Sequence, residues 1–435
     1  MRALSVAIIG GLTAGLLACT PPVAAQVPAE GRWTAEARMG PEAMTLLLDL
    51  ERRDGELGGR ISVPAERVLG LGLEGLVCGD GQVAFRIPHP DHPMDFAGRL
   101  GAEQQLEGEL TMGERAVPLV FVHAGATPEP PYRELEVSFA GEGRTVHGSL
   151  LLPPGDGPHP ALALFHPTST PRRDDLRFLA DLAARAGLAA LIYDRREVPA
   201  DVAQLTRADF LAVVADAEAA VRFLRSRDDI DGPQVGVGGL SQGAWIAAIV
   251  ATRVPEVGFV VALSAPGVPL HEIDLYQSTR RLEAAGVQGR ELAEARELLI
   301  KLFAASRGEG GEDGDRDALA RRLEQARSAP WAATLALPDE VPPGGASATL
   351  LRWSAQDLDP LLFFERLRVP VFLAFGERDE RLPAEACATR IAASLERAGN
   401  SAVTLHRYPD ADHALLPAPE LEQDLAGWLR ERAGG

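Results

Sequence analysis

The chain contains very little lysine. Lys301 is the only lysine in 435 residues, and all the other basic residues are arginine. A lysine Schiff base would therefore have to form at that one position, and a phosphate loop ending in Gly-Lys-Ser/Thr does not occur at all. The 62 acidic residues outnumber the 43 basic ones and give a formal net charge of −19. This balance argues against a nucleic-acid partner, because phosphate backbones are bound by clustered positive charge.

Cysteine is also scarce, with three residues in the whole chain: Cys19, Cys78 and Cys387. Two or three cysteines so far apart do not form a disulfide framework, and a zinc site needs clustered Cys and His ligands. His89 and His92 lie in a proline-rich turn and are interpreted as loop histidines. We therefore predict no metal and no other cofactor.

Long apolar runs are missing beyond the N-terminus, where Arg2 is followed by a short apolar stretch over residues 3–17. Such a stretch is typical of a secretory signal, which we place at residues 1–25. The segment Leu16-Leu17-Ala18-Cys19 resembles the lipobox of bacterial lipoproteins, in which the cysteine becomes an acylated N-terminus. The alternative is an ordinary signal-peptidase site at Val23-Ala24-Ala25. We expect an exported protein, periplasmic or tethered to the outer membrane through Cys19.

Short alternating runs separated by glycine and aspartate fill the region from Trp33 to His123. Their spacing of about ten residues is typical of an antiparallel barrel or sandwich. We place an N-terminal antiparallel β domain at residues 27–125 and find no catalytic candidate in it. The proline-rich segment 127–131 then predicts a stiff linker.

From residue 132 to the C-terminus, continuous apolar strands alternate with amphipathic helices. This pattern predicts an α/β domain at 132–435, with a mostly parallel sheet between two layers of helices. The alternation is interrupted over residues 270–355, which contain two helical stretches and no clear strand. An insertion between two sheet strands is a candidate lid over a functional site.

The strand predicted at 234–238 leads into Gly239-Leu240-Ser241-Gln242-Gly243, and a helix follows. A serine on a sharp turn between strand and helix exposes its hydroxyl at the edge of the sheet, and the two glycines leave room for the turn. The alternatives are a structural turn serine and a degenerate dinucleotide fingerprint at 236–241. The dinucleotide interpretation fails, because the next strand ends in Ser264 and not in the required acidic residue.

A serine nucleophile needs a histidine base and a carboxylate that orients the base. Asp379 follows the strand predicted at 369–375, and His413 follows the strand at 403–408. The carboxyl ends of parallel strands meet at one edge, so both side chains are expected near Ser241. Glu377 and Glu380 are rival acids. His406 is the rival base, but its mid-strand position would keep it away from the serine.

The order Ser241, Asp379, His413 resembles the triad of the α/β-hydrolase superfamily, in the branch of bacterial exported esterases and of serine-aminopeptidase-like and dienelactone-hydrolase-like proteins. Residues 193–196, Tyr-Asp-Arg-Arg, resemble the Tyr-Asp-x-Arg segment of this branch, although Glu197 replaces the usual glycine. The resemblance covers roughly 300 residues and implies an α/β-hydrolase fold with an oxyanion hole.

The oxyanion hole is where this sequence departs from the family pattern. One donor is expected to be the backbone N–H of Gln242. The other usually comes from a His-Gly-x loop, but here the residues are His166-Pro167-Thr168. Proline has no N–H to donate, so the second donor is expected to be Thr168.

These residues predict a serine hydrolase of carboxylic esters that acts on small molecules through an acyl-enzyme. Export argues against coenzyme A thioesters as substrates. Two alternatives stay open: an exported peptidase of oligopeptides, and a non-catalytic binding lipoprotein that uses a hydrolase scaffold. Only the proline in the oxyanion loop favours the latter.

Overall fold

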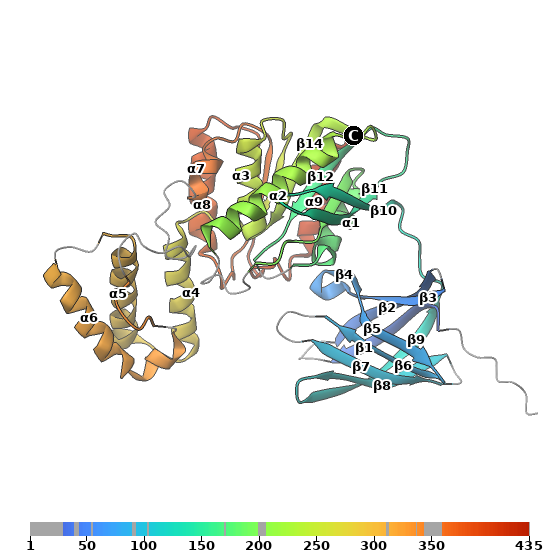
Figure 1. The fold of residues 1–435 in the computed structure, drawn as a ribbon, viewed down its shortest axis with the longest axis horizontal. Helices are drawn as coiled ribbons and strands as arrows, with labels where there is room; N and C mark the ends of the chain where they lie inside the picture. The colour runs from blue at the N-terminus through green and yellow to red at the C-terminus, as the bar shows by residue number, and fades with distance from the viewer. Residues whose placement is uncertain are drawn as a thin grey trace, which may run out of the picture.

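The computed structural model describes residues 29–38, 43–53, 55–88, 93–101, 104–168, 171–198, 206–309, 313–335, 337–342 and 359–434 (Figure 1). Cys19, the rest of the predicted signal segment, His89 and His92 lie outside the described residues, as does the end of the predicted insertion from residue 343 on. No helix in the described ranges has the length and hydropathy needed to cross a membrane.

The N-terminal part of the chain forms one nine-stranded antiparallel sheet. Its order is β4-β3-β2-β1-β9-β8-β7-β6-β5, so almost every strand pairs with its neighbour in the sequence. The strands are β1 (Gly31–Arg38), β2 (Ala43–Arg53), β3 (Glu56–Val63), β4 (Val68–Gly72), β5 (Glu74–Gly79), β6 (Gln82–Ile87), β7 (Met94–Leu100), β8 (Gln105–Met112) and β9 (Arg115–Gly125). The sheet curls around its core like a barrel (Figure 1). A single-turn 3-10 helix, η1 (Pro64–Glu66), separates β3 from β4.

The strands of this sheet alternate between buried apolar residues and more exposed residues. In β6, Val83, Phe85 and Ile87 are buried, while the residues between them are not. Every second side chain of a strand points to the same face, so these residues fill the inside of the curled sheet. Trp33 of β1 is fully buried in the same core. The sequence predicted six of the nine strands; it missed β1 and the two glycine-rich strands β4 and β5.

The second sheet has eight strands in the order β10-β11-β13-β12-β14-β15-β16-β17. The β10–β11 and β11–β13 pairs are antiparallel and the other five pairs are parallel, so the predicted mostly parallel sheet is present. The strands are β10 (Arg133–Ala140), β11 (Thr145–Leu152), β12 (His159–Phe165), β13 (Ala189–Tyr193), β14 (Ile230–Leu240), β15 (Val260–Leu263), β16 (Val371–Gly376) and β17 (Val403–Tyr408). All six residues of β16 are buried, as expected for a strand covered on both faces.

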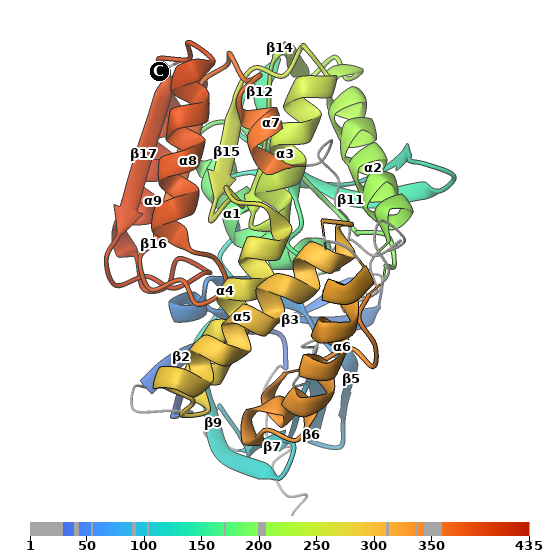
Figure 2. The same ribbon diagram turned by 90° about the vertical axis from the view of Figure 1, so that its left-hand side faces the viewer.

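Helices cover both faces of this sheet (Figures 1 and 2). One core lies between the sheet and α2 (Arg207–Arg225), α3 (Gln242–Arg253), α7 (Pro360–Phe364) and α8 (Ala384–Arg397). The other lies between the sheet and α1 (Arg177–Arg185) and α9 (Pro419–Arg432). The helix predicted from 174 differs at its start, because residues Arg173–Leu176 form a 3-10 turn, η2, before α1.

A helical insertion separates β15 from β16. It contains α4 (Leu270–Ala284), α5 (Gly289–Ser306), α6 (Asp313–Arg327) and a short 3-10 helix, η3 (Pro330–Thr334). These elements pack on one another through their own apolar cluster, which includes Leu282, Leu298 and Trp331. They project from the sheet on the side of the N-terminal sheet (Figures 1 and 2). The sequence predicted α5 and α6 but missed α4, the helix next to the sheet.

Candidate active site

Ser241 occupies a strained turn between β14 and α3. Its backbone has φ 57° and ψ −119°, a conformation that residues other than glycine rarely adopt. The turn is held from the neighbouring strand, because the Ser241 N–H donates to the carbonyl of Leu263 at 2.8 Å. The strand–serine–helix turn predicted from the sequence is therefore present, with the serine partly exposed.

The two glycines that flank Ser241 are required by close backbone packing. A Cβ on Gly239 would lie 2.5 Å from the carbonyl oxygen of Phe165, and one on Gly243 would lie 2.1 Å from the same oxygen. Both distances are far below van der Waals contact. The glycines thus bring the end of β12, and with it the loop after Phe165, against the turn that carries the serine.

Asp379 and His413 form a buried pair. Nδ1 of His413 lies 2.7 Å from Oδ2 of Asp379. The other carboxylate oxygen, Oδ1, accepts hydrogen bonds from the backbone N–H groups of Arg381 at 2.8 Å and Leu382 at 2.7 Å. The Asp379 side chain is fully buried and that of His413 is 10% exposed. A carboxylate fixed in this way can hold the imidazole in one orientation and one tautomer.

The rival residues do not form the pair seen between Asp379 and His413, although Glu380 lines the same cavity as Ser241. Glu377 and Glu380 are exposed, and the structure gives neither a bond to a histidine. His406 stays within β17, where it lies 3.2 Å from Asp424 and stacks on Phe372. These positions leave Asp379 and His413 as the only acid–histidine pair that lies beside Ser241 among the described residues.

A buried arginine organises the predicted oxyanion loop. Nη1 of Arg195 donates to the carbonyl of Thr168 at 2.6 Å and to that of Pro167 at 3.1 Å. Its Nη2 donates to Oε1 of Gln242 at 2.6 Å. Burial lowers the pKa of Arg195 to about 10, so the guanidinium stays charged at neutral pH. One side chain therefore links both residues predicted to supply the oxyanion hole.

The direction of these bonds bears on the Thr168 donor. The Pro167–Thr168 peptide is trans, so its N–H points away from its own carbonyl. Because that carbonyl faces Arg195, the Thr168 N–H faces the opposite way. The trans peptide thus directs the Thr168 N–H away from the arginine that binds the loop carbonyls.

Ser241, His413, Gln242 and Thr168 line one cavity of about 800 Å³. Apolar side chains from α3 and α4, such as Trp245, form part of its wall. The complete lining is Pro167, Thr168, Leu240, Ser241, Gln242, Trp245, Pro266, Leu270, Ile273, Asp274, Gln277, Arg280, Arg281, Ala284, Glu380, Arg381, Leu382, Asp412, His413 and Ala414. The structure therefore brings the predicted site residues, which are far apart in the sequence, to one opening; Asp379 lies directly behind His413.

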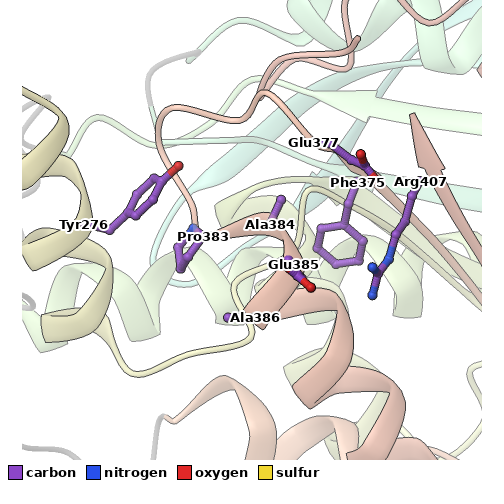
Figure 3. A pocket seen from close by; sticks show the side chains of 8 residues that line it. All are labelled: Tyr276, Phe375, Glu377, Pro383, Ala384, Glu385, Ala386 and Arg407. Carbon is purple, nitrogen blue, oxygen red and sulfur yellow. The ribbon is translucent and has the colours of Figure 1, made fainter. Parts of the chain in front are cut away.

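A second hollow, of about 510 Å³, lies beside the loop between β16 and α8 and contains none of the predicted site residues (Figure 3). It is lined by Tyr276, Phe375, Glu377, Pro383, Ala384, Glu385, Ala386 and Arg407. Its charged groups are exposed. Within the described ranges, no three His, Cys, Asp or Glu side chains come together in a way that could hold a metal ion.

The insertion holds the loop that carries the acid, a contact that the sequence did not predict. The hydroxyl of Tyr276 in α4 donates to the backbone carbonyl of Asp379 at 2.7 Å. The next residue, Gln277, donates through Nε2 to the carbonyl of Arg381 at 3.0 Å. The helical periodicity of residues 270–284 could have revealed α4, but a bond to a backbone carbonyl leaves no pattern in the sequence.

Part of the chain is similar in sequence to a known family and to two known proteins. Residues 217–306, which include Ser241, match the family described as BAAT / acyl-CoA thioester hydrolase C terminal. Esterase EstD of Thermotoga maritima is 27% identical over 260 residues, 58% of this chain and 54% of that protein. The peroxisomal succinyl-coenzyme A thioesterase of Mus musculus is 31% identical over 126 residues, 28% of this chain and 27% of that protein.

Among solved structures, the Pyrobaculum calidifontis esterase aligns over 71% of this chain and 88% of its own, with 17% identity and a TM-score of 0.43. The chain spans about half the length of the Thermotoga relative and about a quarter of the mouse relative. The matched proteins are named esterases and thioesterases. The family match and the two relatives found by sequence confirm the resemblance to the α/β-hydrolase superfamily and support the predicted enzyme class, hydrolase.

Proposed function

We propose that this chain, with its α/β-hydrolase fold, is a serine hydrolase that cleaves carboxylic esters through a Ser241–His413–Asp379 triad. The observation that carries the proposal is the shared cavity: Ser241 on its strained turn and His413 bonded to buried Asp379 line the same opening. The esterase relative supports the choice of substrate class.

In the proposed reaction, Oγ of Ser241 bonds to the ester carbonyl carbon while Nε2 of His413 takes the hydroxyl proton. The carbonyl electrons move to the oxygen, and the backbone N–H groups of Gln242 and Thr168 stabilise that oxyanion. When the intermediate collapses, the C–O bond to the alcohol breaks and His413 returns the proton to the leaving oxygen. Water then attacks the acyl-enzyme by the same route and releases the acid and free Ser241.

We further infer that the insertion is a lid, as its position in the sequence predicted. The support is that α4 contributes Leu270, Ile273, Gln277 and Arg281 to the wall of the cavity. The same helix holds the Asp379 loop through Tyr276. A helix that both covers the cavity and contacts the acid loop would exclude water around a bound acyl group.

A second candidate function is hydrolysis of thioesters. It is favoured by the match of residues 217–306 to an acyl-CoA thioester hydrolase family. Predicted export weighs against it, because coenzyme A thioesters are intracellular metabolites. The export signal itself, with Cys19 as an acylated tether, is retained as a proposal. Cys19→Ala should move the protein from the membrane fraction to the soluble fraction.

The test is labelling and turnover on one set of samples. Wild-type protein should react with a fluorophosphonate probe, and Ser241→Ala should not. Aryl acetates and butyrates should be cleaved by the wild type, with turnover at least about a thousandfold lower in Ser241→Ala. Ser264→Ala, a buried serine outside the cavity, is the matched control.

The outcomes separate the alternatives. Equal labelling of wild type and Ser241→Ala would contradict Ser241 as the nucleophile. No labelling of either protein would contradict the proposal and favour a binding protein on a hydrolase scaffold. Faster cleavage of acyl-CoA thioesters than of oxygen esters would favour the second candidate. Cleavage of peptide amides in preference to esters would indicate the exported peptidase.

A further inference from the structure

The N-terminal sheet reaches the loop that carries His413 through one side chain. Arg67 ends the 3-10 helix η1, and its backbone is left-handed, with φ 51°. Nη1 of Arg67 donates to the carbonyl of Leu415 at 2.6 Å, and Nη2 donates to the carbonyl of Ala418 at 2.5 Å. These bonds join residues 348 and 351 positions apart in the chain.

The segment that Arg67 binds runs from His413 to the start of α9. Leu415 is fully buried and has φ 62°, a left-handed conformation that is unfavourable for a non-glycine residue. Asp412 gives the segment its internal bonds, from its backbone N–H to Leu416 and from its carbonyl to the Leu415 N–H. The guanidinium adds a bond on the far side of Leu415, so the strained turn is fixed from both ends.

The surroundings of Arg67 fit a positioning role. Its side chain is only 11% exposed, lies over the ring of Phe178 at 5.5 Å, and is 3.8 Å from Glu422. Burial lowers the pKa of the Arg67 guanidinium, so its removal from water is costly. That cost is offset by fork-shaped hydrogen bonding to two carbonyls, for which arginine geometry is suited and lysine geometry is not.

Other contacts between the two sheets lie away from the His413 segment. Arg60 of β3 is 3.5 Å from Glu134 of β10, and the Gly72 N–H donates to Asp174 at 3.3 Å. Arg172 also pairs with Glu74. These contacts attach the N-terminal sheet to β10, to η2 and to the residue that precedes η2. Arg67 differs from them because its partners directly follow the proposed base.

We propose that Arg67 is a positioning residue for His413, and that the N-terminal β sheet thereby completes the active site of the hydrolase domain. This inference rests on the proposed function, since it assigns His413 as the base. It gives the N-terminal sheet a role in turnover, although that sheet contributes no residue to the cavity lining.

The test compares Arg67→Met with Arg60→Met. Both remove a guanidinium of the N-terminal sheet that contacts the hydrolase domain, but only Arg67 touches the His413 segment. We expect Arg67→Met to lower kcat for an aryl acetate by at least about 20-fold with KM changed less than about threefold, because a displacement of the base near 1 Å impairs proton transfer. Arg60→Met should stay within about twofold of wild type.

A second pair of measurements separates positioning from stability. Low millimolar guanidinium should raise the kcat of Arg67→Ala about fivefold over the value without guanidinium, because the small cation can occupy the vacated site. A purely structural loss would not be recovered at this concentration, which is far too low to change the free energy of unfolding. Arg67→Lys, which keeps the charge and can reach one carbonyl, should fold and show an intermediate kcat. That variant keeps the test informative if Arg67→Met does not fold.

The readout that does not depend on activity is hydrogen exchange in residues 409–421. Exchange there should be at least about tenfold faster in Arg67→Met than in Arg60→Met. Wild-type kcat retained in Arg67→Met, or an equal loss in Arg60→Met, would overturn the proposal, and so would unchanged exchange. If the wild type neither hydrolyses esters nor reacts with the probe, the proposed function fails, and exchange alone then decides whether Arg67 fixes this segment.

Discussion

The two sheets use their strand ends differently. In the eight-stranded sheet, β12, β14, β16 and β17 run parallel, so the loops that follow them share one edge and carry Thr168, Ser241, Asp379 and His413. In the nine-stranded antiparallel sheet, adjacent strands end at opposite edges. Loops that are close in sequence are therefore separated in space, and none contributes to the cavity lining. Strand direction, more than strand number, decides where chemistry can converge.

The two sheets also differ in how many residues of each strand are buried. All six residues of β16 are buried, whereas only every second residue of β6 is. Helices cover both faces of the eight-stranded sheet, and the nine-stranded sheet has one face on its own core and the other toward solvent. A sheet with two covered faces leaves only its edges for function, and the strand ends are the edge that the helices do not close.

The comparison of strand ends in the two sheets predicts its largest loss of activity at Asp379, at the end of β16. Asp379→Asn should lower kcat for an aryl acetate by about 10⁴-fold, because an amide would favour the wrong tautomer of His413. Glu377→Gln and Glu380→Gln, in the same loop, should stay within about threefold. The measurement is kcat for each variant at a fixed pH. Equal losses in all three variants would indicate a general requirement for loop charge and would contradict the assignment of the acid.

A smaller effect is expected where the ends of β12, β13 and β14 meet. Arg195→Met should lower kcat by about 30- to 100-fold, because the Pro167 and Thr168 carbonyls and the Gln242 amide lose their shared donor.

The neighbouring Arg196 provides the matched control. It pairs at 2.8 Å with Asp216, which is buried. Arg196→Met should therefore lower the free energy of unfolding by roughly 3 kcal/mol, while the folded fraction keeps its kcat. Thermal unfolding and kcat should be measured on both variants. If Arg195→Met loses stability alone, the guanidinium has no part in arranging the oxyanion loop.

The smallest effect on activity is expected at Glu134 of β10, where Arg60 joins the two sheets away from the His413 segment. Burial would raise the pKa of Glu134, but hydrogen bonds and charge attraction from Arg177 outweigh it and lower the pKa to about 2. A folded-state pKa below the unfolded value of 4.5 means that the carboxylate stabilises the fold above about pH 4.5 and loses this contribution as pH falls towards 2.

Glu134→Gln should thus lower the free energy of unfolding by roughly 1–3 kcal/mol at pH 7 with little change in kcat. The difference in free energy of unfolding between wild type and Glu134→Gln, measured by urea unfolding, should become smaller between pH 4.5 and pH 3. A difference that is independent of pH over this range would mean that packing, not ionisation, makes residue 134 important.

Much of the fold could be predicted because its signals are local. The periodicity of β6 and the continuous apolar run of β16 are visible in adjacent residues, and the glycines around Ser241 mark a tight turn with no room for a Cβ. The elements missed have weaker local signals. β4 and β5 contain several glycines, and α4 follows directly on a loop, in an insertion for which only two other helical stretches were predicted.

The sequence by itself predicted most of the elements, their order and a candidate serine, acid and histidine, because strand and helix periodicities and parallel strand ends are properties of nearby residues. Only the tertiary structure decided what holds these groups in place. Arg67 on the Leu415 carbonyl, Arg195 on the Thr168 carbonyl and Tyr276 on the Asp379 carbonyl all bind the backbone of distant segments. Every residue has such a carbonyl, so the partner leaves no mark on the sequence, and the fold alone chooses it.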